Sequence, residues 1–417
     1  MIQKPKGTVD YYEDYGYNLS FLISYLNSFM SVYNYNYIKT PSFEVSELFY
    51  RGVGETTDIV NKETYDFKDK GNRKMTLRPE VTAGVVRSYI ENKLYAEGLL
   101  KKFYYIGSCF RYERPQSGRF REFMQFGVEA FGSKSACMDA EVISIAYRFL
   151  SNIGLDNLVV KLNTLGDKES REAYREALVK HFEGGIDSLC DTCKERYLKN
   201  PLRILDCKVD SENDLIKNAP KTVDYLNEES KKFYEDLKSC LDDLDIPYEE
   251  DSRLVRGLDY YTHTVFEIVS DLKELGPAST ICGGGRYDNL VETLGGPSTP
   301  GVGFALGLDR LLKIIESEEI RIDKPKIDAY VLNMSETNDA FMIADELRSE
   351  GFVIELDYLG KNMKGQFKQV DKFNPSYVII VGEDEVKGDY VTIKDNLTKE
   401  SEKVKRINLI DFFKYRV

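Results

Sequence analysis

The most regular apolar pattern in the chain is a pair of aromatic and β-branched runs within Phe103–Gly132. Pro and Gly residues interrupt the connection between the runs, so the pattern predicts two strands joined by a loop. Because side chains alternate across a strand, Gln125 and Glu129 share one face, while Phe126 and Val128 share the other, which we expect to be core. An amide and a carboxylate on an apolar strand are costly to bury without partners. The pattern therefore indicates either a polar ligand site or a hairpin with a solvated outer face.

The periodicity of the remaining sequence changes several times along the chain. Residues up to about 165 mix helical and strand patterns, with a helix predicted over Leu19–Val32 and a loop-to-helix junction at about Glu80. Residues 166–248 are rich in Lys, Glu and Asp at helical spacing, which predicts an inserted helical module. Residues 249–323 return to a Gly-rich, strand-like pattern.

The C-terminal part of the chain alternates apolar runs with helical segments from Asp328 onward. The two predicted helices cover about 338–350 and 363–373, and each lies between strand-like runs. This order predicts a small α/β domain with a mainly parallel or mixed sheet. The linker before it is expected at Ile320–Pro325.

Composition narrows the class of protein. At 417 residues the chain exceeds the usual size of a single core, so two or three domains are expected. The sequence contains no apolar run long enough for a membrane span and no apolar signal core, which favours a cytoplasmic location. Seven cysteines, an odd number, fit reduced thiols better than a disulfide framework. A net charge of −13 argues against broad nucleic-acid binding but leaves room for a local basic patch.

Two segments near the hairpin carry groups that suit a charged ligand. Glu80 and Thr82 stand two positions apart at the loop-to-helix junction and can both reach one ammonium group, although a helix cap explains Glu80 equally simply. Arg111 closes the first strand of the hairpin, and the loop after it adds further guanidinium groups. That arrangement suits a ligand with a polyanionic end and a smaller cationic end.

Three Gly-containing segments follow. Arg256 precedes a glycine, so the backbone there can approach a ligand closely, while Tyr260 and Tyr261 offer hydroxyls and flat faces. A surface arginine with two core tyrosines is the alternative. Three consecutive glycines in Cys282–Asp288 mark a tight backbone site. Small residues alternate in Gly301–Leu311, which leaves room for a flat ligand and brings Arg310 near a helix start.

Together these segments resemble one family, histidyl-tRNA synthetase, a class II aminoacyl-tRNA synthetase. Tyr37–Phe49 resembles class II motif 1, Phe110–Phe123 resembles motif 2 and Gly301–Leu311 resembles motif 3. These three motifs define only the class. Leu254–Thr262 and Gly283–Asp288 resemble the two histidine-specific peptides of the family, which are far more discriminating.

The resemblance implies a fold and a domain order. It implies an α+β catalytic domain built on an antiparallel sheet of the class II synthetase type, a helical insertion, and a C-terminal α/β anticodon-binding domain. The catalytic domain would comprise 1–167 and 248–323, with the insertion at 168–247 and the anticodon-binding domain at 326–417. Motif 1 usually forms a dimer interface, so a homodimer is implied as well.

The resemblance also implies an activity, the ATP-dependent ligation of L-histidine to tRNA(His) through a histidyl-adenylate. Mg²⁺ would arrive with ATP, and no tightly bound cofactor is expected. The residues implied to bind histidine are Glu80, Thr82, Gln125, Glu129, Tyr260 and Tyr261. Those implied to bind ATP are Arg111, Glu113, Arg119, Phe123, Arg256 and Arg310. Of these, Arg256, Arg111 and Gln125 would act most directly on the reacting groups.

Two regions are candidates for binding tRNA. Arg114 and Gln116, in the hairpin loop, are expected to contact the acceptor end. In the C-terminal domain four lysines are spaced by three and four residues, which places them on one stripe of a helix. Such a stripe suits phosphate contacts, although a solvated helix face is the plainer explanation of the spacing alone. The four lysines are Lys361, Lys364, Lys368 and Lys372.

The insertion contains cysteines that invite comparison with a zinc site. Cys190 and Cys193 form a close pair, but Cys207 has no close partner in the sequence. A structural zinc site needs four ligands and usually two close pairs. His181 is the one histidine in the region that could complete the set. We therefore expect free thiols here and no metal.

Two other functions remain open. One is a non-catalytic regulatory subunit of ATP phosphoribosyltransferase, a synthetase-like protein that typically lacks the last domain and has lost active-site residues. The other is a synthetase for a different amino acid, such as glycine, proline or threonine. The first is disfavoured because the last domain is present, as are the active-site residues that the resemblance implies, Arg111, Gln125, Glu129, Arg256 and Arg310. The second is disfavoured because such synthetases share the class motifs and the last domain but not the segment Leu254–Thr262.

Overall fold

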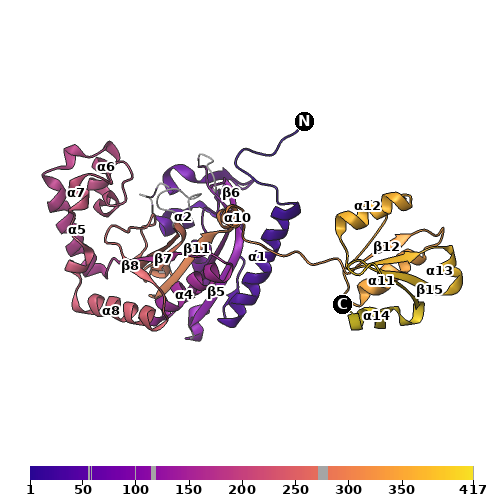
Figure 1. Ribbon diagram of the computed structural model, residues 1–417. Coiled ribbons are helices and arrows are strands. Elements are labelled where there is room, and N and C mark those ends of the chain that lie inside the picture. The colour runs from indigo at the N-terminus through magenta and orange to yellow at the C-terminus, as the bar shows by residue number, and fades with distance from the viewer. Residues whose placement is uncertain (55–56, 58, 99, 114–118, 271–279, 417) are drawn as a thin grey trace. The chain divides into compact units, whose positions relative to one another are not determined.

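The computed structural model describes residues 1–417 except 55–56, 58, 99, 114–118, 271–279 and 417. Contacts within the chain divide it into two compact units, 1–321 and 322–417, which Figure 1 draws in ribbon form. The boundary between them falls inside the expected linker. Each unit has its own sheet and its own core.

The first unit is organised by an extended sheet. Its five central pairings are antiparallel, and the two outermost strands pair parallel with their neighbours. Segments far apart in sequence therefore lie side by side, as β11 and β6 do in Figure 1. Within the described residues the sheet has eight strands, in the order β1 (Asn36–Tyr37), β5 (Lys101–Phe110), β6 (Glu122–Phe131), β11 (Gly301–Gly307), β10 (Thr280–Arg286), β9 (Thr262–Ser270), β7 (Leu158–Thr164) and β8 (Tyr248–Glu250).

The predicted hairpin is formed by β5 and β6, which pair antiparallel over their whole lengths. Phe126 and Val128 are fully buried, so the prediction that this face of β6 is core is confirmed. The Phe126 ring lies 5.7 Å from that of Phe149 in α4 (Ala136–Asn152), and Phe149 in turn packs on α1 (Glu13–Val32). The two helices thus cover the apolar face and leave Gln125 and Glu129 on the opposite one.

The opposite face of the sheet is covered by α3 (Thr82–Glu91), which follows a small antiparallel sheet. That sheet has the order β2 (Phe43–Val45), β4 (Lys74–Leu77) and β3 (Tyr65–Lys68). The helix begins at Thr82, slightly later than predicted, because Glu80 precedes the first turn and accepts a hydrogen bond from it. Beside α3 lie α2 (Ser46–Val53) and α9 (Leu290–Thr293).

The segment between β7 and β8 is helical, as its periodicity predicts. It comprises α5 (Lys168–Glu183), α6 (Asp191–Lys199), the 3₁₀ turn η4 (Pro201–Ile204), α7 (Asp214–Lys217) and α8 (Glu228–Asp243) among other turns. A disulfide joins Cys240 of α8 to Cys137 of α4, so the expectation of reduced thiols is wrong for this pair. The pairing joins residues 103 positions apart, which sequence spacing alone does not reveal.

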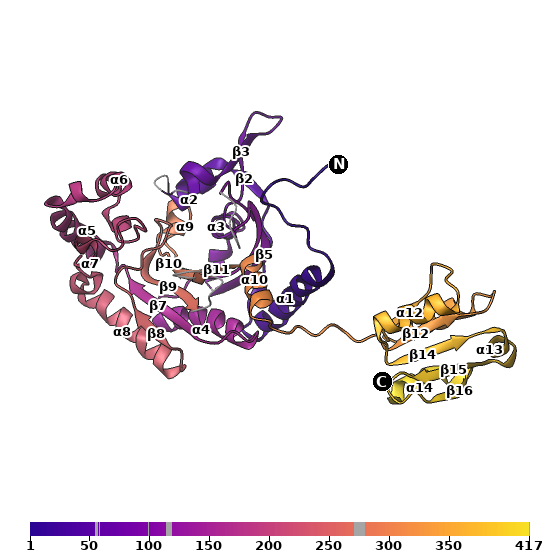
Figure 2. The same ribbon diagram turned by 45° about the horizontal axis from the view of Figure 1, so that its top comes forward.

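The second unit is an α/β domain with a mixed sheet, as predicted. Its strand order is β13 (Ile354–Leu356), β12 (Ala329–Asn333), β14 (Tyr377–Val381), β15 (Tyr390–Asp395) and β16 (Ser401–Lys405), and Figure 2 shows the last four of these side by side. Pairings of β12 are parallel and those of β15 antiparallel. The predicted helices appear as α11 (Asp339–Ser349) and α12 (Met363–Phe373).

Alternation along β12 separates the two cores of this unit. Ala329 and Val331 point to one face and pack with α11 and α14 (Leu409–Arg416), whereas Tyr330 and Leu332 point to the other and pack with α12. Across both units, no helix in the described part of the chain is long and apolar enough to cross a membrane.

Candidate active site

Glu129 lies at the centre of the polar face of the large sheet, and it is only 1% exposed. The Thr82 hydroxyl donates a hydrogen bond of 2.6 Å to Oε1, and the Tyr287 hydroxyl donates to Oε2. Burial raises the pKa of Glu129 to about 8, although these two hydrogen bonds oppose the shift. A buried carboxyl group of this kind suits a basic, donor-bearing ligand group, with which it can share a proton.

The neighbouring strand β11 makes room for this side chain. Gly303 is the register partner of Glu129, and a Cβ atom at Gly303 would lie 2.1 Å from Glu129 Oε2. Only a residue without a side chain fits this position. The space that the small residues of β11 leave is therefore filled, at Gly303, by the Glu129 side chain.

Glu80 forms the helix-cap contact that its position in the sequence allowed, and one of its oxygens remains unused. Oε1 accepts a hydrogen bond of 3.0 Å from the backbone N–H of Ala83, as a helix cap does. Oε2 is buried and has no hydrogen-bond partner. Burial raises the pKa of Glu80, and the nearby Arg111 acts in the opposite direction. An unpartnered buried oxygen beside the first turn of α3 is suited to a cationic ligand group.

Two tyrosines of this site were missed by sequence reasoning. Tyr287 donates to Glu129, and Tyr105 of β5 has a buried hydroxyl without a partner. Tyr105 pairs in register with Gly127, where a Cβ atom would lie 2.3 Å from the tyrosine hydroxyl. Residues directly opposite in a ladder share a face, so the glycine between Gln125 and Glu129 was the available signal for a large side chain on β5.

Gln125 lies on the same face of β6 as Glu129, with Gly127 between them. Its side chain is buried, and its Oε1 lies 3.5 Å from the thiol of Cys109, a long contact to a weak donor. Gln125 is the register partner of Gly107 on one side and of Gly307 on the other. An added Cβ atom at Gly107 would lie 2.2 Å from Arg78, so that guanidinium covers the β5 side of the amide, whereas at Gly307 the nearest atom would lie 4.0 Å away.

Tyr260 and Tyr261 lie against the residues that hold Glu129. Their ring centroids are 4.7 Å apart, and the Tyr260 ring lies 5.6 Å from that of Tyr287. Burial raises the pKa of both hydroxyls, and the carboxylates of Glu80 and Glu129 raise that of Tyr260 further. The structure thus brings the segment Leu254–Thr262 to the carboxylates of the hairpin face.

Arg256 is held against strand β10. Its guanidinium forms an ion pair with Glu267 of β9, and a Cβ atom at Gly283 would lie 2.4 Å from one of its terminal nitrogens. The Nε atom is buried without a partner. The glycines of β10 therefore allow a partly buried arginine to lie flat against the strand, and its Nε retains an unused donor.

Arg111 stands at the end of β5, close to the start of α3. Its Nε donates a hydrogen bond of 2.9 Å to the carbonyl of Pro79, and its guanidinium lies 5.4 Å from the centre of the Phe123 ring. This contact is a cation–π arrangement. Arg111 is thereby fixed between the hairpin and Glu80.

Arg119 and Arg310 extend the positive charge beyond Arg111. Arg119 pairs with Glu113 at 3.3 Å and remains half exposed. Burial lowers the pKa of Arg310, in the first turn of α10 (Leu308–Ser317), and the proximity of Arg119 lowers it further. Like charges held close together in the absence of a ligand are suited to binding an anion.

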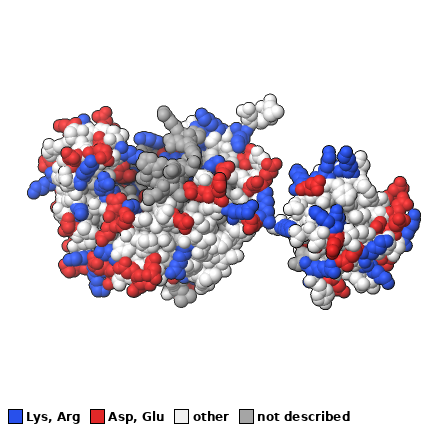
Figure 3. Space-filling view, viewed as in Figure 1, with Lys and Arg blue, Asp and Glu red and all other residues white. Residues whose placement is uncertain are grey.

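The structure describes four of the six candidate tRNA-binding residues. Arg114 and Gln116 fall outside the described residues. Lys361 precedes α12 and is partly buried, whereas Lys364, Lys368 and Lys372 are exposed on that helix. In Figure 3, Lys and Arg side chains gather over α12.

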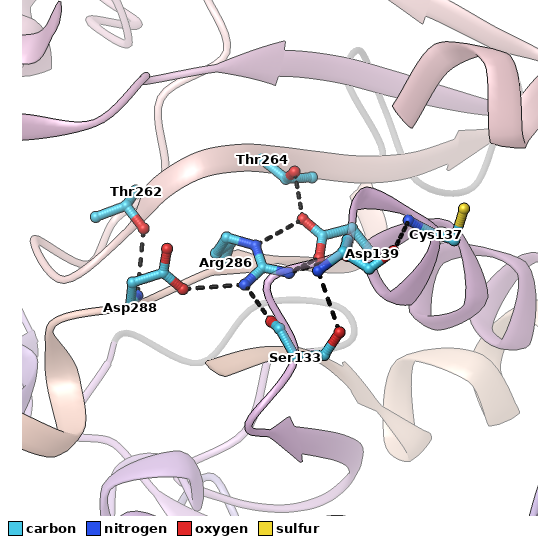
Figure 4. A network of polar contacts seen from close by, with 8 residues as sticks. Ser133, Cys137, Asp139, Thr262, Thr264, Arg286 and Asp288 are labelled. Carbon is cyan, nitrogen blue, oxygen red and sulfur yellow. Dashed lines mark hydrogen bonds and ion pairs between the residues drawn. The ribbon is translucent and has the colours of Figure 1, made fainter. Parts of the chain in front are cut away.

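Arg286, in the histidine-specific segment Gly283–Asp288, is buried and bonded to other residues of the protein. It is 1% exposed and forms ion pairs with Asp139 of α4 and, at 3.0 Å, with Asp288, as Figure 4 shows. It also donates to the carbonyl of Ser133 at 2.9 Å, while Thr264 donates to Asp139. This network ties β10 to α4 on the side away from Glu129, so Arg286 supports the fold of the site.

Comparison with known proteins gives a consistent result. Residues 8–311 match the family model described as histidyl-tRNA synthetase, and residues 328–416 match the one described as anticodon binding domain. The chain belongs to the histidyl-tRNA synthetase family. It is 49% identical over 417 residues to a histidine–tRNA ligase of Macrococcus caseolyticus, with 99% of each chain covered. The family is one of class II aminoacyl-tRNA synthetases.

Solved structures agree with this family. The crystal structure of apo S. aureus histidyl-tRNA synthetase matches with a TM-score of 0.85 at 42% identity, covering 99% of this chain and 100% of that one. A Bacillus halodurans chain titled ATP phosphoribosyltransferase regulatory subunit/histidyl-tRNA synthetase matches with a TM-score of 0.64 at 22% identity, covering 91% and 98%. The second match shows a shared fold, so the fold alone does not separate the synthetase from the regulatory alternative. The high identity to the ligases favours the synthetase.

Proposed function

We propose that this chain ligates L-histidine to tRNA(His), using ATP to form a histidyl-adenylate. The observation that carries the proposal is the buried pair of carboxyl groups on one face of the hairpin. Glu129 there holds two hydroxyl donors, and Glu80 keeps a buried oxygen without a partner. A ligand with one imidazole and one ammonium group complements both. A cytoplasmic location, where tRNA is charged, belongs to the same proposal.

In this proposal the amino acid binds across the polar face of the sheet. Glu80, Thr82 and Gln125 hold the α-ammonium group, and the buried Oε2 of Glu80 gains the donor that it lacks. Glu129 and Tyr261 contact the two imidazole nitrogens, while Tyr260 shapes the pocket wall. An apolar side chain would leave Glu129 buried without its ligand partner, which explains discrimination against it.

The first chemical step is an in-line displacement at the α-phosphorus of ATP. An oxygen of the histidine carboxylate forms the new bond to phosphorus, and the bond to the bridging oxygen breaks, so its electron pair leaves with pyrophosphate. Arg256 and Arg111 stabilise the negative charge on the reacting phosphate. Because both are held by protein contacts before ligand binds, little reorganisation is needed.

The remaining groups orient the nucleotide. Arg119 and Arg310 bind the outer phosphates, and their mutual repulsion is relieved when the anion arrives. Phe123 stacks on adenine, with Glu113 beside it. Because Arg111 lies over the Phe123 ring, one contact connects the base to the reacting phosphate.

In this proposal Mg²⁺ binds together with ATP. The carboxylates beside the arginines, Glu113 and Glu267, are already paired with Arg119 and Arg256, so the site fits an ion that is coordinated mainly by phosphate and water. When bound, the ion would neutralise charge on the phosphates. Arg256 and Arg111 would still bear directly on the α-phosphate.

The second step transfers histidine to tRNA. A hydroxyl of the terminal ribose attacks the carbonyl carbon of the adenylate, and AMP leaves with the electrons of the broken bond. Arg114 and Gln116 are the candidates for contacting the acceptor end, and the lysines of α12, preceded by Lys361, for contacting phosphates at the anticodon end.

A homodimer is part of the proposal. Tyr37, Phe43 and Val45 in the motif 1 segment are each 51% exposed, and Phe67 of the same small sheet is also exposed. Although β4 lies between their strands, the rings of Phe43 and Phe67 are 6.1 Å apart, and such a group of exposed apolar side chains is suited to an interaction surface. A second copy of this chain is the partner that the motif implies.

Pyrophosphate exchange with the purified full-length chain tests the proposal. Label should move from pyrophosphate into ATP when histidine is supplied, and not with glycine, proline or threonine. No exchange with any amino acid would support the regulatory alternative. Exchange driven by one of the other three would support a synthetase of different specificity.

A further inference from the structure

A cluster of side chains in the helical insertion has the composition of a metal site. Cys190 and Cys193 lie at the start of α6, and Cys207 and Asp210 lie in the turn that follows η4. The ligand atoms of all four lie within 4.8 Å of one another. Among the described residues, no other group of three or more Cys, His, Asp or Glu side chains is arranged in this way. The proposed ligation reaction does not use any of them.

We propose that the chain binds one structural Zn²⁺ ion through Cys190, Cys193, Cys207 and Asp210. The sequence favoured free thiols because Cys207 lacked a close partner, and the fold supplies that partner as Asp210. His181, the alternative fourth ligand, is engaged elsewhere, since its Nε2 lies 2.7 Å from the carbonyl oxygen of Leu215.

Two distances within the cluster match those of a tetrahedral zinc centre. With Zn–S bonds of about 2.3 Å and Zn–O bonds of about 2.1 Å, two sulfur ligands lie about 3.8 Å apart and a sulfur–oxygen pair about 3.6 Å apart. The Sγ atoms of Cys190 and Cys207 are 3.7 Å apart. Cys207 Sγ and Asp210 Oδ2 are 3.5 Å apart. The other pairs lie within 4.8 Å, so rotation and small shifts of the side chains bring all four ligand atoms around one ion.

The surroundings partly shield the four ligands from water and hold them in place. Cys193 and Cys207 are buried, and Cys190 and Asp210 are partly buried. The backbone N–H of Cys190 donates to Asp210 Oδ2 at 3.0 Å, and that of Asp210 points to Cys207 Sγ at 3.5 Å. Such contacts orient ligands around a metal. Three sulfurs and one oxygen select zinc over magnesium or calcium.

The position of the site gives the ion a structural role. The segment between Cys193 and Cys207 contains η4, where Arg203 donates to Asp259 at 3.0 Å and to the carbonyl of Gly257 at 2.9 Å. Asp259 and Gly257 belong to the histidine-specific segment Leu254–Thr262. Four protein ligands leave no open coordination position, as in structural rather than catalytic zinc sites. Zinc would thus hold the insertion turn that supports the histidine-specific loop.

Cobalt substitution tests the proposal on the full chain. Protein stripped of metal by a chelator, and kept under anaerobic conditions without reductant so that the Cys137–Cys240 disulfide stays closed, is titrated with Co²⁺ and then with Zn²⁺ while absorbance is recorded. We expect thiolate-to-cobalt charge-transfer bands and tetrahedral d–d bands that saturate at about one ion per chain and disappear when zinc displaces cobalt. An octahedral spectrum without thiolate bands, or no cobalt bound to protein whose Cys190, Cys193 and Cys207 thiols are shown to be free by thiol labelling, would overturn the proposal.

Variants identify the ligands. Removal of a group that only orients a ligand already weakens metal sites by about 10–100-fold, so Cys207→Ser should weaken zinc affinity by at least about 100-fold. Asp210→Cys should keep one ion and strengthen the charge-transfer bands, which shows that the site is intact. His181→Ala, the matched control, should bind zinc as the unaltered chain does. Loss of zinc from His181→Ala with retention in Cys207→Ser would overturn the assignment.

Discussion

Glu129 is almost completely shielded from solvent, and its environment links the active site to the stability of the fold. Two hydroxyl donors and a glycine in the next strand allow the carboxyl group to be buried, but they do not fully offset the loss of water. Burial raises its pKa from an ordinary value of 4.5 to about 8. In the absence of ligand the fold therefore favours the protonated group.

The sign of the resulting pH dependence is fixed by that shift. Between pH 4.5 and about 8 the folded protein binds one more proton at Glu129 than the unfolded chain does. The stabilising contribution of Glu129 to the free energy of unfolding is fully present below pH 4.5. It falls by about 1.4 kcal/mol per pH unit between pH 4.5 and about 8, and it is lost above the pKa of the folded state.

Glu129→Gln removes this titration. Without ligands, the free energy of unfolding of the unaltered chain should fall relative to the variant as pH rises from about 5 to about 8, and the difference should then level off. Denaturant titrations across the range measure it. Glu229→Gln, an exposed change in α8, is the control and should track the unaltered chain. A constant difference between Glu129→Gln and the unaltered chain at every pH would contradict this prediction.

Arg256 offers a prediction about catalysis. Arg256→Ala should lower the rate of histidine-dependent pyrophosphate exchange by about 10²–10³-fold, because it removes a preorganised donor from the reacting phosphate. Arg253→Ala is the matched control, since Arg253 is exposed in the same segment. It should retain the original rate. Equal reductions of the rate in the two variants would show that Arg256 acts only through the fold of the segment.

Strand β11 lies between the strand that carries Glu129 and the strand against which Arg256 packs. It pairs with β6 on one side and β10 on the other, so its glycines determine how closely the carboxylate and arginine sides of the pocket approach. At Gly303 an added Cβ atom would lie 2.1 Å from Glu129 Oε2, whereas at Gly307 its nearest neighbour would lie 4.0 Å away.

These two glycines should respond differently to the same substitution. Gly303→Ala should lower the free energy of unfolding by about 1–3 kcal/mol or more, because the strand must shift to accommodate the methyl group. Gly307→Ala should be close to neutral. Thermal melts of both variants measure the effect. Equal changes in the two melting temperatures would contradict the explanation that Gly303 is required because Glu129 packs against it.

The sequence predicted the elements of the site better than its internal contacts. Period-two alternation placed Gln125 and Glu129 on one face of a strand, because that property is local. The partners of Glu129 were not predictable in the same way, since Thr82 and Tyr287 reach it through strand and helix packing. Tyr105 was missed because its neighbour across the sheet depends on register.

Helix α12 carries the prediction for tRNA binding. Replacing Lys364, Lys368 and Lys372 with Ala should raise the KM for tRNA and reduce the salt dependence of log KM by about one unit for each phosphate that these lysines neutralise. Pyrophosphate exchange, which needs no tRNA, should not change. The control replaces Lys387, Lys399 and Lys405, which are exposed elsewhere in the same unit. Equal effects on tRNA charging in both triple variants would indicate non-specific attraction rather than a binding helix.

The proposed homodimer can be tested at the small sheet of the first unit. Phe43→Asp places a charge on an exposed apolar surface, so it should convert a dimer into a monomer in sedimentation equilibrium. Leu397→Asp, at an exposed apolar residue of the second unit, should leave the assembly unchanged. A monomeric unaltered chain, or a Phe43→Asp variant that remains dimeric, would contradict this interface.

At the scale of the whole chain, the domain division could be predicted from the sequence, whereas the contact between the insertion and the histidine-specific loop could not. The division into a catalytic unit and a C-terminal unit was visible in the change of periodicity near the linker. The tie between the insertion and the histidine-specific loop, formed by Arg203 and Asp259, joins residues with no shared local pattern. Contacts of this kind are specified by tertiary packing, which a single sequence does not display.

A crystal structure of the full-length chain with a non-hydrolysable histidyl-adenylate analogue would reveal how the pocket holds its ligand. We expect the imidazole between Glu129 and Tyr261, the ammonium group at Glu80 Oε2, and the group that replaces the phosphate beside Arg256 and Arg111. An analogue bound with its imidazole away from Glu129, or with no arginine near the phosphate position, would contradict the proposed binding mode.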